Sequence, residues 1–448
     1  MEETARLSES IKELLAGGRD ERLAALLDDA HAADISQTLR ELPVADQVRL
    51  FRMLDPQQAG AVLAELDDQV LLELVRALDE TEVSKILEQM PSDDVVEVVE
   101  ELPKEQADKI LDLMEEAKSE EVQELLEYGE GTAGRLMSPR FVAVNEHVTV
   151  AQAIDHIRKS ASGEDAFYLY VVDDHDHLVG MIPVHRLVTA DPTTPIRALR
   201  AEDVESVSVD TDQEEVARLV ERYNVMEVPV VDADRRLLGR ISVDDVIDVI
   251  HEEATEDIQR LGGAAGDETV LDPPRSVFST RLVWRLINLA TALLAASVIG
   301  LFESSIQTLA TLAVFMPIVA SMGGIGTTQT ATVVVRGIAL GEMNRHVLTR
   351  VISKELWLAL TTGVANGLIL AVIAYLWKGQ VLLSLILGIA LVFNMLVAAV
   401  VGTLVPMALR AFRIDPAIAS SVIITTFTDV FGFFSFLGLA TLMMRYLL

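Results

Sequence analysis

The chain has 448 residues, no cysteine and a formal net charge of −33. Without cysteine it has no disulfides, no thiolate metal ligands and no cysteine nucleophile. Residues 1–275 hold 26 basic and 64 acidic residues (−38), whereas residues 276–448 hold 10 basic and 5 acidic ones (+5). So acidic a segment excludes nucleic acid as a partner, because phosphates require Lys and Arg, and it favours bound cations. Ordinary solvation of a large acidic surface is the alternative explanation.

The N-terminal segment, residues 1–130, has the pattern of an all-α helical solenoid. Its first thirty residues are charged and helical in pattern, which argues against a cleaved signal peptide. Over residues 34–114 an apolar residue recurs every twelve positions, and Pro or Asp follows most of these residues. Pro and Asp end one helix and begin the next. Short helices of this kind bury their apolar faces only by stacking, and the resulting solenoid serves by default as a scaffold or protein-binding surface. The repeating residues are Leu42, Leu54, Leu66, Leu78, Met90, Leu102 and Met114.

Residues 131–243 change to an α/β pattern that occurs twice. We expect strands at 141–144, 168–173 and 178–182 with a helix at 150–158, and then strands at 205–209, 227–232 and 237–242 with a helix ending at Tyr223. This tandem order resembles paired cystathionine-β-synthase (CBS) domains, regulatory modules that often bind adenosine nucleotides.

The CBS signature Gly-x-x-Ser/Thr-x-x-Asp is complete only in the second copy, as Gly239, Ser242 and Asp245. The first copy has Pro183 and Arg186 at the two polar positions. The resemblance therefore allows ATP or another adenosine nucleotide as a ligand of Ser242 and Asp245, and it argues against a complete site in the first copy.

Residues 244–272 form a connecting segment, and Asp244 to Leu261 has the pattern of one long acidic helix. Asp245, Asp248, Glu252 and Glu256 share one face of this helix. Like charges at three- and four-residue spacing destabilise a helix unless they are neutralised. A divalent cation bridging this face to another acidic surface would neutralise them. A solvated face is the alternative.

Residues 273–448 form a membrane domain with five expected spans, at 282–301, 306–335, 352–377, 381–409 and 416–447. Basic residues gather before the first span, between the second and third, and between the fourth and fifth. The opposite side has only Lys378 and Arg445. The positive-inside rule then places the acidic N-terminal part in the cytoplasm and the C-terminus outside.

Asp429 lies inside the last span, fourteen residues after Asp415 and nineteen before the C-terminus. At about 1.5 Å per residue this places it near mid-bilayer. A charge at that depth costs at least about 2.5 kcal/mol, so it faces a water-filled path or a partner. We expect Glu303 and Asp415 to be the only other acids near the spans, both at interfacial depth. Asp429 therefore indicates cation handling.

A series of short motifs, in order, resembles the MgtE family of magnesium channels over essentially the whole chain. The motifs are Gly131-Thr132-Ala133-Gly134-Arg135-Leu136-Met137, Glu253-Ala254-Thr255-Glu256-Asp257-Ile258, Phe302-Glu303, Pro317, Gly323-Gly324, Gln329-Thr330-Ala331, Asp415-Pro416-Ala417 and Asp429-Val430 with Gly432. The resemblance implies a homodimer in the bacterial inner membrane, with its pore on the two-fold axis. It also implies that the helix after the CBS pair couples the cytoplasmic domains to the pore, and that intracellular Mg²⁺ closes the gate.

The resemblance assigns the pore site to Asp429, where two symmetry-related carboxylates would hold Mg²⁺ with its water shell. Thr425 and Thr428 could add oxygen atoms, although threonines in a helix commonly bond back to the preceding turn. The resemblance also implies regulatory Mg²⁺ between the acidic layers. Its expected ligands are Asp245, Asp248, Glu253, Glu256 and Asp257 on the connecting helix, with Asp93, Asp94 and Glu97 on the solenoid.

Two departures from the family pattern leave the transported ion open. Ile325 and Ser421 stand where the family commonly has Asn, so two polar groups near the pore are missing. A transporter of Co²⁺ or Mn²⁺ is therefore one alternative, and a membrane-anchored Mg²⁺ sensor without conduction is another. An enzyme is not expected, because the sequence has no Cys-His, Ser-His-Asp or phosphate-loop constellation and its eight His are scattered.

Overall fold

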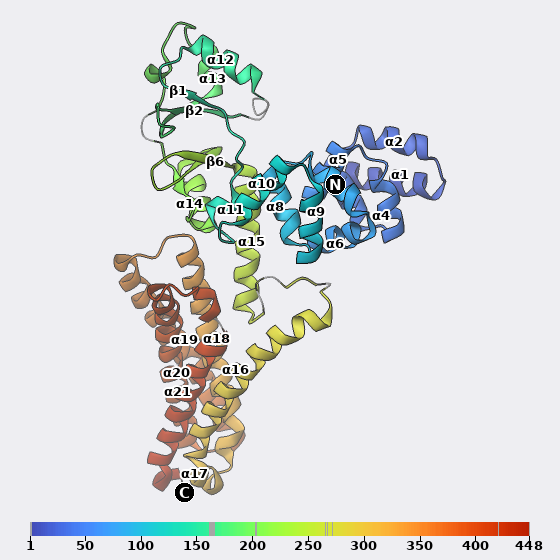
Figure 1. Ribbon diagram of the computed structural model, residues 1–448. Coiled ribbons are helices and arrows are strands. Elements are labelled where there is room, and N and C mark those ends of the chain that lie inside the picture. The colour runs from blue at the N-terminus through green and yellow to red at the C-terminus, as the bar shows by residue number, and fades with distance from the viewer. Residues whose placement is uncertain are drawn as a thin grey trace. The chain divides into compact units, whose positions relative to one another are not determined.

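A computed structural model describes residues 2–160, 166–201, 204–264, 266, 268–270, 272–419 and 421–447 (Figure 1). The chain divides into an N-terminal unit, residues 1–251, and a membrane unit, residues 252–448. The long helix α15 (Val243–Leu261) contains the boundary between them.

The first part of the N-terminal unit is a stack of short helices, as the twelve-residue repeat predicts. Helices pack on their second neighbours along the chain: α3 on α5, α4 on α6, α5 on α7, α7 on α9 and α8 on α10. Asp caps start two of them. Asp55 accepts hydrogen bonds from the amides of Gln57 and Gln58, and Asp79 forms a capping box with Glu82. The helices are α1 (Glu2–Ala16), α2 (Asp20–Asp28), α3 (Ala32–Arg40), α4 (Val44–Phe51), α5 (Pro56–Ala64), α6 (Asp68–Ala77), α7 (Glu80–Leu87), α8 (Ser92–Glu100), α9 (Lys104–Leu113) and α10 (Glu116–Leu126).

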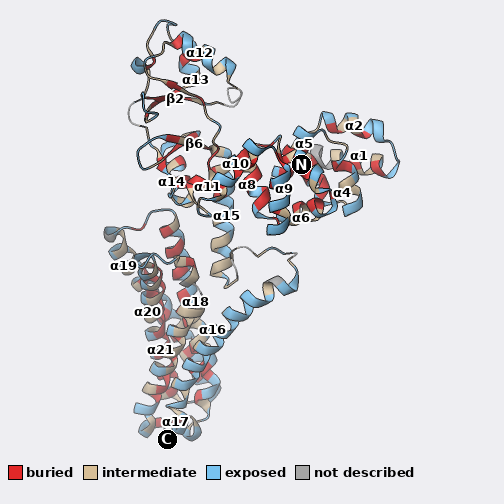
Figure 2. Ribbon diagram, in the orientation of Figure 1, coloured by how far each residue is buried: buried red, intermediate tan, exposed pale blue. Residues whose placement is uncertain are grey.

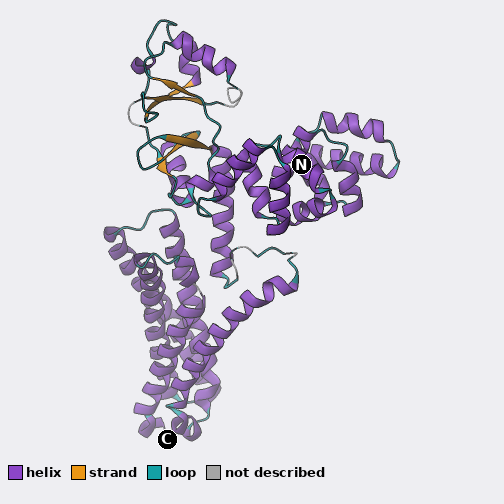
Figure 3. Cartoon of the chain, in the orientation of Figure 1, coloured by secondary structure: helices purple, strands orange, loops and turns teal. Residues whose placement is uncertain are grey.

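The CBS pair follows as two three-stranded sheets, drawn in orange in Figure 3. In each sheet the first strand pairs parallel with the second, and the second pairs antiparallel with the third. Two predicted strands are shorter than expected, since only residues 143–145 and 207–208 pair with their neighbours. The elements are α11 (Ala133–Leu136), β1 (Ala143–Asn145), α12 (Val150–Lys159), β2 (Tyr168–Val172), β3 (Leu178–Pro183), α13 (Val184–Thr189), η2 (Ile196–Ala198), β4 (Val207–Ser208), α14 (Gln213–Tyr223), β5 (Glu227–Val231) and β6 (Leu237–Ser242).

A buried ionic network joins the two CBS copies. The Glu227 carboxylate is 1% exposed and accepts hydrogen bonds from Tyr170 Oη at 2.8 Å and Arg240 Nη1 at 3.0 Å. The amide of Phe167 completes its partners at 3.3 Å. Tyr170 belongs to the first copy and Arg240 to the second. A fully partnered buried charge of this kind fixes one relative arrangement of the two sheets.

The membrane unit contains five described helices that are long and apolar enough to cross a membrane. They lie within α16 (Pro274–Gly300), α18 (Thr311–Ala339), α19 (Arg345–Lys378), α20 (Val381–Ala411) and α21 (Ser421–Leu442). Shorter elements are α17 (Glu303–Thr308), η3 (Pro416–Ala419) and α22 (Met444–Leu447).

Four of the five predicted spans are wrong at an end. The spans predicted at 282–301 and 352–377 begin earlier, at Val277 and His346, whereas those predicted at 306–335 and 416–447 begin later. The second of the five begins only at Thr311, because the backbone of Leu309 leaves the helical region and separates α17 from α18. The last begins at Ser421, because Asp415 caps a separate turn by accepting a hydrogen bond from the Ala417 amide at 2.8 Å. It ends at Leu442 rather than 447.

Helices α18, α20 and α21 contact one another and form the interior of the membrane unit. In contrast, α16 contacts α21 but is drawn largely exposed in Figure 2. Only 6% of its most apolar stretch is buried. Lipid or another protein surface must cover such a helix in a membrane.

Candidate functional site

Asp429 lies on α21, the helix that contacts α16, α18 and α20. Its side chain is half-buried within the single chain. The last span runs from Val422 to Leu442, so Asp429 lies about 10 Å from one end and twice as far from the other. It is therefore about one third of the way through the span rather than at its middle.

The threonines near Asp429 bond to their own helix. Thr428 Oγ1 donates to the Thr425 carbonyl at 2.9 Å, and Thr425 Oγ1 donates to the Val422 carbonyl at 3.3 Å. Thr428 is also fully buried. These contacts are the local bonding that threonines adopt inside helices. The assignment of Thr425 and Thr428 to a pore site stays a prediction.

One helical turn from Asp429, beside Gly432, a buried asparagine occupies the junction of three helices. Asn394 of α20 is 0% exposed and donates through Nδ2 to the Val319 carbonyl of α18 at 2.9 Å. A Cβ at Gly323 of α18 would lie 2.2 Å from Asn394 Nδ2, and one at Gly432 of α21 would lie 2.8 Å from it. Both glycines are therefore required for the close approach of these helices. Sequence patterns offered no signal for Asn394, because its neighbours come from two other helices.

A second acid lies inside the spans, which corrects the prediction that only Glu303 and Asp415 accompany Asp429. Glu355 of α19 is 8% exposed and accepts a hydrogen bond from Thr330 Oγ1 of α18 at 2.9 Å. Its other oxygen lies 3.2 Å from Lys354 Nζ. The predicted span at 352–377 included this residue, but its carboxylate is recognisable as buried only once α18 is packed against α19.

Ile325 is 52% exposed, so its side chain points away from the interior of this chain. The side chain of Ser421, the other departure from the family pattern, lies outside the described part of the chain.

Three predicted regulatory acids gather in the N-terminal unit. Burial, the charge of Asp93 and the charge of Asp245 raise the pKa of Asp94 to about 7. Burial also raises the pKa of Asp245 to about 6, with the Asp93 charge adding to it, and raises that of Asp93. Asp93 Oδ1 accepts a hydrogen bond from Ser138 at 3.2 Å. We name Asp93, Asp94, Asp244 and Asp245 the acidic cluster.

Nearby cations offset the acidic cluster only in part, because the charges of Arg240 and Lys118 lower the pKa of Asp93 less than burial raises it. Lys118 is held by the Met90 carbonyl at 2.8 Å and Ser92 Oγ at 2.5 Å, and burial lowers its pKa to about 8. The predicted ligands Glu97 and Asp248 are exposed. The cluster therefore concentrates like charges in a partly desolvated place, which is the condition that favours a bound divalent cation.

The remaining predicted regulatory ligands belong to the membrane unit. Glu253, Glu256 and Asp257 are half-buried on the second half of α15. Glu256 forms an ion pair with Arg260, and Arg260 also pairs with Asp415 at the start of η3. Arg260 thus bridges the end of the connecting helix to the turn that precedes α21. This residue was not predicted, because its partner is 155 positions away.

The predicted nucleotide residues form a helix cap. Asp245 Oδ2 accepts hydrogen bonds from the Ser242 amide at 3.0 Å and from Ser242 Oγ at 2.5 Å, at the start of α15. The same carboxylate belongs to the acidic cluster, which repels phosphate. Nucleotide binding at Ser242 and Asp245 stays a prediction.

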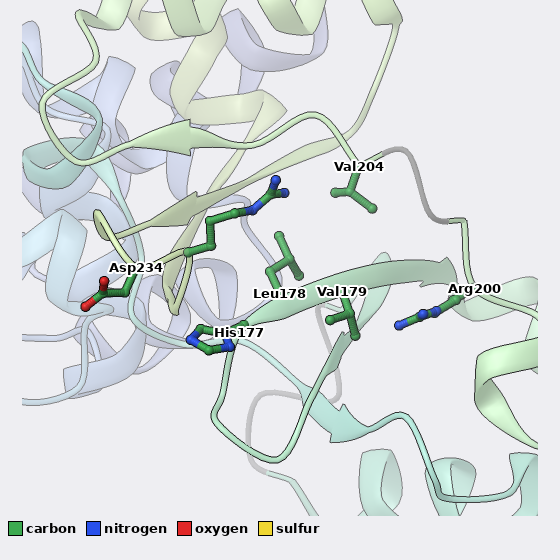
Figure 4. Close-up of a pocket in the computed structure, with 7 residues that line it drawn as sticks. His177, Leu178, Val179, Arg200, Val204 and Asp234 are labelled. Carbon is green, nitrogen blue, oxygen red and sulfur yellow. The ribbon is translucent and has the colours of Figure 1, made fainter.

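A pocket of about 540 Å³ opens where the two CBS copies meet at their hairpins. Figure 4 shows His177, Leu178 and Val179 from the first copy and Asp234 from the second, with Arg200 and Val204 from the connection between the copies. None of the sequence motifs pointed to this pocket.

Together, an acidic side chain inside a span, a partly desolvated acidic cluster and a CBS pair define a multi-pass membrane protein with regulatory domains, of the kind that handles cations. The comparisons with known proteins are specific. Residues 316–439 match the MgtE divalent cation transporter family, residues 30–131 match the MgtE intracellular N domain, and residues 133–193 and 196–252 match CBS domains.

The chain belongs to the MgtE family of magnesium transporters. It is 34% identical over 318 residues to the magnesium transporter MgtE of Bacillus subtilis, covering 70% of each chain. It is 36% identical over 321 residues to that of Thermus thermophilus, covering 71% of each chain. The crystal structure of the cytosolic domain of the Mg²⁺ channel MgtE in complex with ATP covers 54% of this chain and 99% of that one, with 33% identity and a TM-score of 0.52.

Proposed function

We propose that this protein is a Mg²⁺-selective channel for magnesium uptake, in which Asp429 is the pore ligand. The observation that carries the proposal is a half-buried carboxylate inside the last span. Such a charge is stable only beside water or a cation. Mg²⁺ dehydrates reluctantly, so carboxylates that bind its water shell suit its passage. The family relatives are transporters rather than enzymes, and the proposal includes no catalytic activity.

The active form in this proposal is a homodimer in the bacterial inner membrane, with Asp429 of both subunits on the two-fold axis. Family membership and the exposed surface of α16 support it. The N-terminus is cytoplasmic and the C-terminus is outside, as the distribution of basic residues indicates.

Gating by intracellular Mg²⁺ is the regulatory part of the proposal. The acidic cluster holds like charges close together, so Mg²⁺ bound there stabilises the compact arrangement of the N-terminal unit. A ligand shifts such an equilibrium only by its differential affinity for the two states. Helix α15 then carries the change to the pore through Arg260 and Asp415. A nucleotide on the CBS pair, as in the relative crystallised with ATP, is a further ligand to test.

The test compares Asp429→Ala with Glu303→Gln in a bacterial strain deficient in magnesium uptake. Glu303 is the control because it is exposed, begins the short helix α17 and interacts locally with Gln307 at 3.2 Å. We expect Glu303→Gln to support growth at low external Mg²⁺ and Asp429→Ala to fail at equal expression. Growth of the Asp429→Ala strain at the wild-type rate would refute the role of this residue.

Selectivity is tested with the purified protein in liposomes. Mg²⁺ entry is measured alone and in competition with Co²⁺ and Mn²⁺, because the family description covers divalent cations in general. We expect neither metal to enter faster than Mg²⁺. Faster entry of Co²⁺ or Mn²⁺ would support the alternative cargo, and no entry of any ion would support a non-conducting sensor.

A further inference from the structure

Two histidines and an aspartate converge on the hairpin between β2 and β3 of the first CBS copy. Asp173, His175 and His177 each offer one ligand atom, and these atoms all lie within 4.8 Å of one another. His177 Nδ1 is 2.9 Å from Asp173 Oδ2. The two imidazole rings stack with their centroids 5.8 Å apart and their planes 19° apart.

The second CBS copy is an internal control for what this hairpin needs structurally. There Asp232 Oδ1 accepts hydrogen bonds from the amides of Asp234 and Arg236 at 2.9 and 2.8 Å. In the first copy Asp173 Oδ1 accepts the equivalent bonds from the amides of His175 and His177 at 2.8 and 3.0 Å. The aspartate therefore shapes the turn in both copies. The imidazoles are not needed for the turn, since Asp234 and Arg236 take their places in the second copy.

Pairing of the two hairpins holds the backbone that carries Asp173, His175 and His177. Residues His177 and Arg236 form an antiparallel bridge, and the Leu178 amide donates to the Arg235 carbonyl at 2.9 Å. His177 also lines the pocket between the copies (Figure 4). Water entering this pocket can supply further ligands. Arg200 at its wall is already paired with Glu146 at 3.0 Å, so Arg235 rather than Arg200 favours an anion as a co-ligand over a second cation.

The donor set selects the kind of ion. Mg²⁺ prefers oxygen ligands, whereas two imidazoles and a carboxylate suit first-row transition ions such as Zn²⁺, Ni²⁺ or Co²⁺. We propose that Asp173, His175 and His177 form a binding site for a transition-metal ion on the first CBS copy, separate from the sites for Mg²⁺. An ion bound there would cross-link the β2–β3 hairpin, whose backbone pairs with the second copy, so a metal other than the proposed cargo would stabilise the CBS pair.

The experiment measures Zn²⁺ bound to the purified full chain in detergent, with excess Mg²⁺ present to fill oxygen-ligand sites. The variant is His175→Gln/His177→Gln, and the matched control is His147→Gln/His185→Gln, two exposed histidines of the same CBS copy. We expect about one Zn²⁺ per chain in the wild type and the control, and at least about tenfold weaker binding in the variant. Cu²⁺ added in place of Zn²⁺ should show splitting from two nitrogen nuclei in its electron paramagnetic resonance spectrum in the wild type and the control, and the double variant should lose this two-nitrogen pattern.

Folding is checked by the single variant His175→Gln, whose side chain is exposed. This variant should keep the wild-type melting temperature without metal and lose most of the increase that Zn²⁺ produces. Equal Zn²⁺ binding by the double variant and the control, or no Zn²⁺ retained by the wild type, would overturn the proposal. Because the readout is metal binding, neither result depends on whether the protein conducts Mg²⁺.

Discussion

At the scale of single residues, Asn394 packs against α21 one helical turn from Asp429. Its amide nitrogen is fixed on the Val319 carbonyl, and its buried Oδ1 has no hydrogen-bond partner among the described residues. Gly432, three residues after Asp429, packs directly against this side chain. The face of α21 that carries Asp429 is therefore held by contacts at Gly432.

Gly432→Ala should destabilise the membrane unit and reduce Mg²⁺ entry. The new methyl group would lie 2.8 Å from Asn394 Nδ2, and overpacking of this kind costs about 1–3 kcal/mol. Gly438→Ala on the same helix is the control, because its new methyl group would meet only Phe302 Cζ at 3.9 Å. The measurement is thermal unfolding of both variants in detergent. Equal melting temperatures would show that the contact at Gly432 does not restrain α21.

Single residues were also where the sequence was least informative. Asp429 was identifiable because a charge inside an apolar run is a local signal. Glu355, Asn394 and Arg260 were missed because each makes its decisive contact with a residue outside its own helix. The twelve-residue repeat, in contrast, was informative. Its spacing predicted the helices of the solenoid because caps and apolar faces are local features.

At the scale of elements, Arg260 connects the end of α15 to the turn that precedes α21. It pairs with Glu256 and Asp415. Arg260→Ala would leave these two carboxylates without their shared cation. If α15 carries the gating signal, the variant should need several-fold more internal Mg²⁺ to close the channel. Mg²⁺ inhibition of flux in liposomes measures this, with the exposed Arg275→Ala as control. An unchanged Mg²⁺ dependence would exclude Arg260 from the coupling.

The acidic cluster links α8 to α15 and makes the N-terminal unit sensitive to pH. Burial and neighbouring charges raise the pKa of Asp94 to about 7 and that of Asp245 to about 6, from an ordinary value of 3.8. An acid whose pKa is raised in the folded state stabilises the fold while it is protonated, and this contribution is lost as pH rises through that value. Asp93 and Asp244 also face these groups, and the facing cations are Lys118 and Arg240.

Without Mg²⁺, the full chain should therefore melt at a higher temperature at about pH 5.5 than at about pH 7.5. Mg²⁺ binds deprotonated carboxylates, so it should raise the melting temperature more at the higher pH. Asp94→Asn/Asp245→Asn should flatten both trends, whereas Asp112→Asn, an exposed acid on α9, should not. A Mg²⁺ effect that is the same at both pH values would contradict a regulatory site in the cluster.

At the scale of the whole molecule, the two ends of the chain have opposite electrostatic characters. Residues 1–275 carry a net charge of −38 and the remainder carries +5. Composition and hydropathy predicted this division and the five spans, and the repeated order of strands and helices predicted the CBS pair. They could not predict the break at Leu309, because backbone geometry within an apolar run leaves no compositional signal. Nor could they identify the partner surface of α16.

The central claim is that the Asp429 carboxylates of two subunits face each other across a water-filled path. Because the chain has no cysteine, Asp429→Cys introduces a unique thiol, and Phe427→Cys on an exposed face of α21 is a matched control. The measurement is thiol cross-linking in membranes with reagents of short and long reach. We predict covalent dimers for Asp429→Cys and far fewer for Phe427→Cys. No dimers at position 429, or equal amounts at both positions, would contradict the account.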